Sequence, residues 1–410
     1  MKIIFITLNY SPELIGVGKY STEMSEWLSS REHTIEVICA PPYYPEWKVR
    51  DGWSSLTYTC EVNKNISIKR CPIYVPEKPT GIKRVIHLFS FWLTSLPIIL
   101  AKTLSKPDLV IVIEPPIFCA SSALLLAKLT GAKSILHVQD FEVDAAFELG
   151  LLKNDLIRSI VSKVERFLLS KFDCVSTISS KMKSKLNEKG VKKESQYLFP
   201  NWVDTNLIVP LTSTSIFFDE LKIPPASKVL LYSGNMGNKQ GLEIIISAAE
   251  MLQSRRDIFI VMCGDGAIKR KLEKLAKNVK NIIWLPFQSL GKLNHLLGLA
   301  TIHLLPQSLE AADLVMPSKL TGMLSSGRPI IATADLNTQL GEVVSKCGIV
   351  VPPGDSVALV SAILKLVDNE ELCDKYGKAA REYAEKEIDI EMVMKKFNMK
   401  INSLVNEDAF

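Results

Sequence analysis

The sequence lacks paired cysteines and any Asp-x-Asp pair. Its eight cysteines are scattered, at positions 39, 60, 71, 119, 174, 263, 347 and 373, and none forms a Cys-x-x-Cys motif. This spacing excludes a zinc knuckle and a thioredoxin-like redox motif, and it fits a reducing cytosol. The missing Asp-x-Asp argues against a divalent-metal clamp. We therefore expect no metal ion and no cofactor at the functional site.

Long hydrophobic runs are also missing. The most apolar stretch, residues 85–101, falls short of the roughly 20 residues that a membrane span needs, and it contains Pro97. A buried or surface-seated helix is expected there. The run at residues 3–8 is too short for a signal-peptide core and is followed by no small-residue cleavage site, so it predicts a first strand.

Charge is unevenly distributed. The whole chain has a net charge of +5, but residues 153–193 contain eleven Lys or Arg against four acids, a local balance of +7. These cations are either solvated helix faces or a surface that attracts anionic lipid or a diphosphate-bearing substrate. Few aromatic residues accompany them to stack on bases, so nucleic acid is not expected as a partner.

Apolar strand-like runs alternate with helical patterns in both halves of the chain. The first series begins at residues 2–8 and the second at residues 228–234, and residues 199–227 between them are rich in Pro, Ser and Thr. Strands separated by helices indicate parallel sheets with right-handed crossovers. The prediction is two doubly wound α/β domains, whose ligands bind at the carboxyl ends of the strands.

The first strand leads into a glycine-containing loop. Gly16 and Gly18 precede a predicted helix, but Ser21 occupies the third glycine position of the dinucleotide fingerprint and no acid ends the second strand. NAD binding is therefore weakly supported. Two readings stay open: a glycine loop that lets substrate approach the helix terminus, or a plain turn.

Three strand-to-helix corners follow one another in the second half. Glycines surround Lys239 in "YSGNMGNKQGLE", Gly264 lies in "CGDGAIKRKLE", and Pro317, Ser318 and Lys319 open a short helix in "LVMPSKLTG". Free backbone N–H groups and a cation at a helix start suit an anion. A lone Pro-Ser-Lys also fits a capped helix with a solvated lysine, but three corners in succession favour a phosphate-bearing ligand.

A further group of polar residues ends an apolar strand in the first half. His137, Asp140 and Asp144 follow one another in "LHVQDFEVDAA". An imidazole and acids at this place suit proton handling or the binding of sugar hydroxyls. The other reading is a capping aspartate beside a histidine at the edge of the core.

Several long phrases together resemble the retaining glycosyltransferases of family 4, and within them the exopolysaccharide glycosyltransferases of colanic acid type. These phrases are "SPELIGVGKYSTEMSEWL", "APPYYPEW", "LHVQDFEVDAAFELGLL", "YSGNMGNKQGLE" and "LVMPSKLTGMLSSGRP". The resemblance implies the GT-B fold, with two Rossmann-like domains facing across a cleft. It implies an acceptor-binding domain at residues 1–203, joined by a C-terminal helix at about 388–410, and a nucleotide-sugar-binding domain at 204–387.

The resemblance also implies residue roles. Gly16 matches the second glycine of the family's Gly-Gly loop, whose first falls on Ile15. His137 and Asp140 lie on the segment that faces the transferred sugar. Ser318 and Lys319, after Pro317, match a Pro-Ser-Lys form of the helix that holds the donor phosphates. The candidate catalytic residues are therefore His137 and Asp140. The candidate donor-binding residues are Gly16, Gly18, Asn235, Lys239, Gly264, Pro317, Ser318 and Lys319.

The sequence departs from the family pattern at the donor site. Two family glutamates, the second of which holds ribose, fall on Leu314 and Gly322, and the family's basic pair falls on Asn235 and Gln240. With fewer positive charges facing the diphosphate, Lys319 is expected to matter more than its counterparts elsewhere.

The expected activity is metal-independent, retaining transfer of a sugar from a nucleotide diphosphate. The expected sugar is fucose, from GDP-fucose, and the expected acceptor is a polyprenyl-diphosphate-linked glycan. The enzyme is expected to be cytoplasmic and to contact anionic lipid at the inner membrane. Two alternatives stay open: a noncatalytic protein that binds nucleotide sugar within an assembly complex, and a nucleotide-sugar epimerase with the same architecture.

Overall fold

The computed structural model describes residues 1–13, 16–148, 155–308 and 317–406. The chain divides into two compact units, which we call unit 1 (Met1–Pro200 with Met394–Phe410) and unit 2 (Asn201–Val393). The sequence-based boundaries, after residue 203 and at about residue 388, lie close to these limits. Each unit is described by itself.

Unit 1 is built on an eight-stranded sheet in the order β3-β4-β2-β1-β5-β6-β7-β8. Neighbouring strands pair in parallel except β3 and β4, which form an antiparallel hairpin. Strand β5 is buried at every position, as expected for a strand covered by helices. The strands are β1 (Lys2–Ile6), β2 (Thr34–Cys39), β3 (Thr59–Asn63), β4 (Ile66–Arg70), β5 (Leu109–Glu114), β6 (Lys133–Val138), β7 (Cys174–Thr177) and β8 (Gln196–Leu198).

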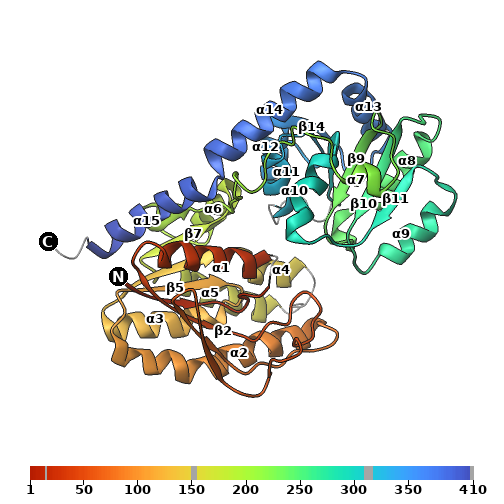
Figure 1. Ribbon diagram of the computed structural model, residues 1–410. Helices are drawn as coiled ribbons and strands as arrows, with labels where there is room; N and C mark the ends of the chain where they lie inside the picture. The colour runs from red at the N-terminus through yellow and green to blue at the C-terminus, as the bar shows by residue number, and fades with distance from the viewer. Residues whose placement is uncertain (14–15, 149–154, 309–316, 407–410) are drawn as a thin grey trace. The chain divides into compact units, whose positions relative to one another are not determined.

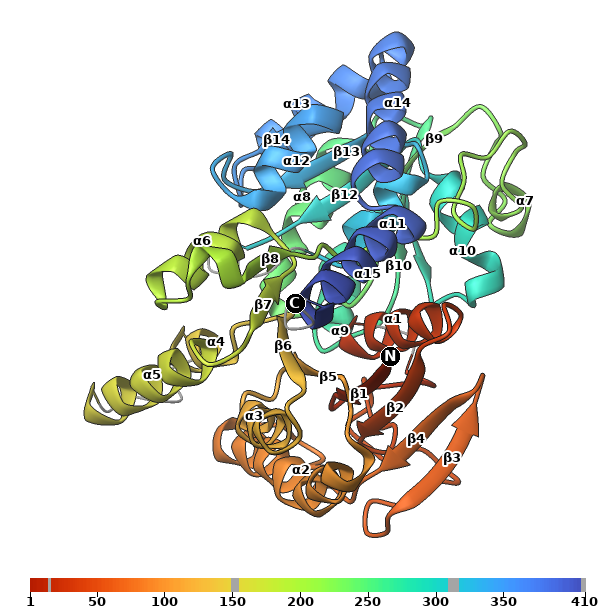
Figure 2. The same ribbon diagram turned by 90° about the vertical axis from the view of Figure 1, so that its left-hand side faces the viewer.

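Helices cover both faces of the unit 1 sheet (Figure 1, Figure 2). The crossovers from β4 to β5, β6 and β7 all progress in one direction, so right-handed connections place α2, α3 and α5 on the same face. The connection from β1 to β2 runs the opposite way and places α1 on the other face. The helices are α1 (Gly16–Ser29), α2 (Gly81–Ala101), α3 (Phe118–Thr130), α4 (Glu142–Glu148), α5 (Asp155–Leu169) and α6 (Ser180–Glu188), with 3-10 turns η1 (Lys102–Ser105) and η2 (Lys193–Ser195).

Unit 2 contains a six-stranded parallel sheet in the order β11-β10-β9-β12-β13-β14. Its strands are β9 (Lys228–Ser233), β10 (Ile258–Cys263), β11 (Ile282–Leu285), β12 (Ile302–Pro306), β13 (Ile330–Thr333) and β14 (Gly348–Val351). Its helices are α7 (Phe217–Glu220), α8 (Glu243–Met251), α9 (Lys269–Leu275), α10 (Leu290–Leu299), α11 (Lys319–Ser325), α12 (Gln339–Cys347), α13 (Ser356–Val367) and α14 (Glu370–Glu387), with η3 (Asn238–Gln240) and η4 (Ala276–Asn278).

The last helix, α15 (Ile390–Asn406), packs its carboxyl-terminal part on unit 1. The Phe397 ring stacks on Phe199 with centroids 4.0 Å apart, and Asn398 Oδ1 lies 2.9 Å from His33 Nε2. Both phenylalanines are fully buried. The aromatic stack therefore anchors the end of the chain to the sheet of unit 1.

Candidate functional site

The three strand-to-helix corners of unit 2 meet at the carboxyl edge of its sheet. The loops after β9 and β10 run in contact: Gly234 N donates to Cys263 O (2.9 Å), and Met236 N donates to Asp265 O (2.8 Å). Gly264 has φ +144°, and a Cβ on it would lie only 2.0 Å from Gly234 O. Only a glycine permits the two backbones to approach this closely.

Lys319 is the first residue of α11, and its side chain lies against the end of β9 and the loop that follows it. Its Nζ lies 3.1 Å from the Tyr232 hydroxyl and 4.2 Å from the centroid of that ring. A Cβ on Gly234 would lie 3.5 Å from the same Nζ. The buried Tyr232 hydroxyl in turn donates to Asn235 O (2.5 Å), so strand, loop and lysine form one connected group.

No carboxylate compensates this lysine among the described residues. Desolvation of the Lys319 ammonium lowers its pKa from 10.5 to about 7. The Lys319 side chain is half-buried, and charges removed from water in proteins are ordinarily paired. A cation at this corner suits an anionic group.

The other predicted donor residues surround this group with different exposure. Asn235 and Lys239 are exposed, and the Lys239 carbonyl accepts from Ser308 N (3.0 Å). Ser318 is exposed immediately before α11, and Pro317 is half-buried beside it. Lys319 is thus half-buried at the corner, whereas Lys239 is exposed at its solvent side.

Of the two positions at which the family has a glutamate, the structure describes only Gly322. Gly322 lies in the middle of α11, and a Cβ there would lie 3.3 Å from Leu297 Cδ1. A side chain at this position would meet a buried leucine, so Gly322 supplies close packing and no polar contact. Leu314 lies outside the described residues, as does Ile15 in the first glycine loop.

A cavity of about 340 Å³ opens on unit 2 near the carboxyl ends of β12 and β14. It is lined by Gly241, Glu243, Ile244, Ser247, Gln307, Ser308, Pro353, Gly354 and Ser356. The Gln307 side-chain oxygen is buried there and has no hydrogen-bond partner. Because Ser308 also bonds to the Lys239 loop, this cavity continues the edge on which Lys319 lies.

In unit 1, Gly16 and Gly18 begin α1 above a buried carboxylate that sequence reasoning missed. Gly16 has φ +57°, and a Cβ on Gly18 would lie 2.9 Å from Glu13 Cβ. One Glu13 oxygen accepts from the backbone N–H groups of Tyr43 and Tyr44, both at 2.8 Å. Glu13 therefore ties the glycine loop to the loop after β2. This role can be identified only from the contacts of Glu13 with Tyr43 and Tyr44, which are far from it in the sequence.

His137 is buried in β6, and both of its ring nitrogens have protein partners. Nδ1 lies 2.9 Å from Ser176 Oγ, and Nε2 lies 2.9 Å from the Gln139 side-chain nitrogen. Burial lowers its pKa to about 3, so the ring is neutral. This geometry fits a histidine that orients the end of β6, and its predicted catalytic role stays a prediction. Asp140 follows β6 as a half-buried residue.

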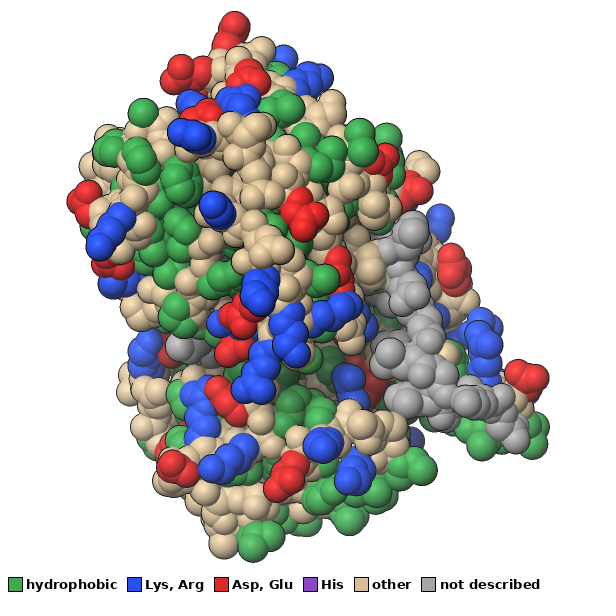
Figure 3. All heavy atoms as spheres, turned by 90° about the vertical axis from the view of Figure 1, so that its right-hand side faces the viewer, with side chains coloured by type: hydrophobic (Ala, Val, Ile, Leu, Met, Phe, Trp, Pro, Cys, Tyr) green, Lys and Arg blue, Asp and Glu red, His purple; other side chains and the backbone are tan. Residues whose placement is uncertain are grey.

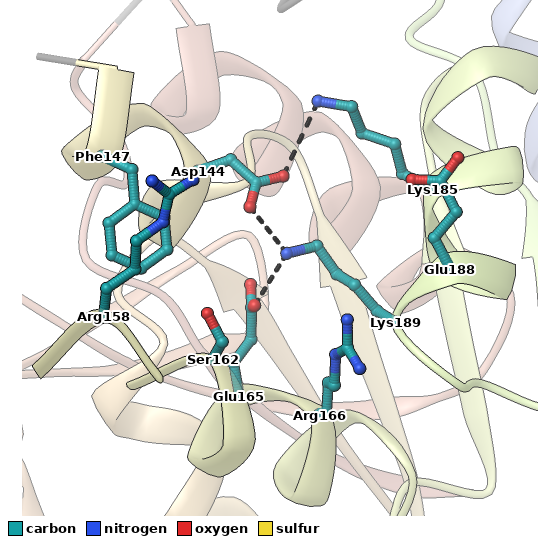
Figure 4. A pocket seen from close by; sticks show the side chains of 9 residues that line it. All are labelled: Asp144, Phe147, Arg158, Ser162, Glu165, Arg166, Lys185, Glu188 and Lys189. Atoms are coloured by element: carbon teal, nitrogen blue, oxygen red, sulfur yellow. Dashed lines mark hydrogen bonds and ion pairs between the residues drawn. The ribbon is translucent and has the colours of Figure 1, made fainter. Parts of the chain in front are cut away.

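Asp144, the third member of that polar group, lies in an ion-pair network (Figure 4). Its carboxylate contacts Lys189 Nζ at 2.7 Å and Lys185 Nζ at 3.6 Å, and Lys189 also contacts Glu165 at 2.7 Å. These contacts join α4, α5 and the end of α6. Two of the cations counted in the basic segment are therefore already paired.

Metal-ligating side chains are not grouped in the part of the chain that the structure describes: no cluster of three or more His, Cys, Asp or Glu could hold an ion there. The described cysteines are all free, and most of them are buried.

Family models match both halves of the chain. Residues 16–202 match the glycosyl transferase 4-like domain, and residues 213–383 match glycosyl transferases group 1. WcaI of Escherichia coli (strain K12), named as a candidate colanic acid biosynthesis glycosyl transferase, is 40% identical over 407 residues, which cover 97% of this chain and 98% of WcaI. The probable glycosyltransferase WbjE of Pseudomonas aeruginosa is 25% identical over 72% of each chain.

Solved structures share the fold at low sequence identity. Sucrose-phosphate synthase from Thermosynechococcus elongatus matches with a TM-score of 0.76 and 16% identity, covering 98% of both chains. Anabaena Alr3699/HepE in complex with UDP matches with a TM-score of 0.74 and 14% identity, covering 98% of this chain and 100% of that one. The chain therefore belongs to the glycosyl transferases of group 1, and it is a glycosyltransferase with the two-domain GT-B fold.

Proposed function

We propose that the protein transfers a sugar, with retention and without a metal ion, from a nucleotide diphosphate bound at the carboxyl edge of the unit 2 sheet. The observation that carries this proposal is Lys319, a desolvated ammonium with no carboxylate partner among the described residues. It lies against Gly234 at a corner where two backbones approach too closely for any side chain. A diphosphate would pair its negative charge with this ammonium.

The chemistry follows from that placement. The bond between the anomeric carbon and the diphosphate oxygen breaks, and the acceptor hydroxyl oxygen bonds to the same carbon while its proton passes to the leaving diphosphate. Negative charge grows on that diphosphate as the bond breaks. Lys319 Nζ and the backbone N–H groups near Ser318 stabilise this charge, because preorganised donors in a desolvated site act most strongly on developing charge. In unit 1, Gly16 and Gly18 are proposed to contribute to donor binding, and His137 and Asp140 are the proposed catalytic residues.

The donor is proposed to be GDP-fucose, and the acceptor a glycan linked to polyprenyl diphosphate in the synthesis of a colanic-acid-like exopolysaccharide. Support comes from WcaI, whose name assigns it to colanic acid biosynthesis and which matches nearly the whole chain. Such an acceptor places the enzyme at the cytoplasmic face of the inner membrane.

A transfer assay tests this proposal against its two alternatives. We expect GDP-fucose with a lipid-linked acceptor to yield a fucosylated product, and Asp140→Ala to reduce the yield. Donor binding without any transfer or hydrolysis would favour a noncatalytic binding protein. Interconversion of the free donor in the absence of acceptor would identify an epimerase and contradict the proposal.

Nucleotide binding is expected to take up a proton. The free Lys319 has a pKa of about 7, and a bound diphosphate raises it because the opposite charge favours the ammonium. Between pH 7.5 and 9 the free enzyme is largely neutral at Lys319 and the complex is protonated. The affinity should therefore fall as pH rises, by up to about tenfold per pH unit.

Isothermal titration calorimetry in two buffers of different ionisation enthalpy measures this uptake. At pH 8 we expect close to one proton with wild type and a loss of that uptake with Lys319→Met, which cannot titrate. Equal uptake in both proteins would contradict the assignment.

The low pKa of Lys319 also affects folding. The free energy of unfolding of the nucleotide-free protein should rise with pH from about 7 to 10.5, because the unfolded lysine binds more protons than the folded one in this range.

A further inference from the structure

Arg381 of α14 directs its guanidinium onto backbone carbonyl groups of unit 2. Lysine and arginine side chains protrude into solvent on the face of the molecule that Figure 3 shows, but the Arg381 side chain is only 19% exposed. Its Nη2 donates to Thr205 O (2.8 Å), and its Nη1 donates to Ile208 O (2.8 Å) and to Ser325 O (3.0 Å). One side chain thus holds three carbonyl groups from two separate parts of the chain.

The first of these parts is the carboxyl end of α11, the helix whose first residue is Lys319. Its last residue, Ser325, is fully buried, and the Ser325 hydroxyl donates to Ile208 O (2.7 Å) and accepts from Arg381 Nη1 (3.1 Å). The last carbonyl groups of a helix have no donors within the helix, and a nearby cation stabilises them. Arg381 therefore fixes one end of a helix about 10 Å long, and Lys319 lies at its other end.

The second part belongs to the chain between the two units. The chain passes between the units twice, and we call the unit 2 residues next to these passages, 201–210 and 388–393, the connecting segments. They are bonded to one another: Val203 N donates to Ile388 O (2.9 Å), and Ile390 N donates to Val203 O (3.0 Å). The two connecting segments therefore form one hydrogen-bonded group on unit 2.

Thr205 joins Arg381 to both connecting segments. Its carbonyl group accepts from Arg381, and its Oγ1 donates to Asp389 Oδ2 (2.6 Å). The other oxygen of Asp389 accepts from Met392 N (3.1 Å) in the first turn of α15. Hydrogen bonds thus run from the end of α11 through Arg381 and Thr205 to the start of α15.

Helix α14 also approaches the end of α11 too closely for a side chain to lie between them. A Cβ on Gly377 of α14 would lie 2.4 Å from Gly327 O, and a Cβ on Gly327 would lie 2.8 Å from Pro210 Cγ. Close-packed interiors transmit small displacements. A shift of the first connecting segment should therefore move the end of α11.

We propose that Arg381 is a positioning residue for sugar transfer, which fixes α11 to the connecting segments and thereby holds Lys319 in one place at the β9 corner. Without its bonds the carboxyl end of α11 is free to shift. A misplacement of about 1 Å at a group that stabilises charge can cost about 100-fold in rate. The proposal rests on the proposed function through the role of Lys319 at the diphosphate.

A double-mutant cycle with Lys319 tests this role. Arg381→Met keeps the apolar stem of the side chain and removes its donors, and it should lower kcat/KM for sugar transfer by about tenfold. In the Lys319→Ala background the same substitution should change kcat/KM by less than about twofold, because Arg381 acts through Lys319. Arg381→Lys keeps the cation but reaches fewer of the three carbonyl groups, so its loss should be smaller than that of Arg381→Met.

Arg255→Met is the matched control. Arg255 pairs with Asp257 and Asp368, at 2.9 Å from each, and precedes β10 at the amino edge of the unit 2 sheet. Lys319 lies at the carboxyl edge. The control therefore removes an arginine that also has several bonds, but it leaves α11 untouched, and kcat/KM should be unchanged in both backgrounds.

Wild-type kinetics in Arg381→Met, or the same fold loss in both backgrounds, would overturn the proposal. If Arg381→Met does not fold, Arg381→Lys takes its place in the cycle. If Lys319→Ala alone keeps wild-type kinetics, the proposed function fails, and amide hydrogen exchange then decides the role of Arg381. Faster exchange in Arg381→Met confined to α11 and residues 201–210 would support positioning, whereas faster exchange throughout unit 2 would show a purely structural contact and overturn it.

Discussion

Lys319→Ala should lower the turnover of sugar transfer by one to two orders of magnitude. The variant loses a charge-assisted contact of roughly 1.5 to 3 kcal/mol, and about 1.4 kcal/mol corresponds to tenfold in rate. The effect on turnover should exceed the effect on substrate affinity, because the charge that Lys319 meets grows as the diphosphate leaves. Steady-state kinetics over a range of donor concentrations measure both.

Two lysines of unit 2 serve as comparisons. Lys274 is exposed on α9, away from the corner, and Lys274→Ala should keep wild-type kinetics. Lys239 is exposed at the solvent side of the corner, so Lys239→Ala should have a smaller effect than Lys319→Ala. Wild-type kinetics in Lys319→Ala, or equal losses in Lys319→Ala and Lys274→Ala, would contradict the role assigned to Lys319.

Gly264→Ala should disrupt the site through the backbone. The added Cβ would lie 2.0 Å from Gly234 O, at a residue whose φ of +144° already disfavours alanine. Overpacking and backbone strain together should lower the free energy of unfolding by roughly 3 kcal/mol. Movement of the β9 corner away from β10 should also weaken nucleotide binding, because Gly234 supports Lys319.

Gly291→Ala is the matched control for this change. Gly291 lies in α10, where an added Cβ would meet nothing within 4 Å. Alanine there should leave stability unchanged or raise it slightly, since alanine is the better helix former. Urea unfolding of both variants gives the comparison. Equal stability of Gly264→Ala and wild type would show that the corner relaxes and that the close approach is not required.

Much of the fold could be predicted from apolar runs bounded by breakers. The β3–β4 hairpin was missed because β3 is mostly exposed and polar. Its two-residue turn uses Lys64 and Asn65, with φ of 48° and 64°, and carries no glycine signal. Apolar runs therefore predict central strands. Edge strands depend on pairing with a neighbouring strand, which their own sequence does not show.

The glycines and Lys319 of the candidate site could be predicted, because strand-to-helix corners have local sequence signatures. The burial of each side chain could not be predicted from the sequence. Lys239 and Lys319 look alike as lysines near glycines, but only the fold distinguishes the exposed one from the desolvated one. Glu13 and the partners of His137 also depend on residues far along the chain.

The most direct test of the central claim is a thermal-shift panel with GDP, UDP, ADP, GDP-fucose and common UDP-sugars, comparing wild type with Lys319→Ala. A nucleotide at about 100 times its dissociation constant adds roughly 2.7 kcal/mol and raises the melting temperature by several degrees. The account predicts a shift for one base, largest with guanine, that weakens in the variant. No shift with any nucleotide, or the same shift in both proteins, would contradict a diphosphate held by Lys319.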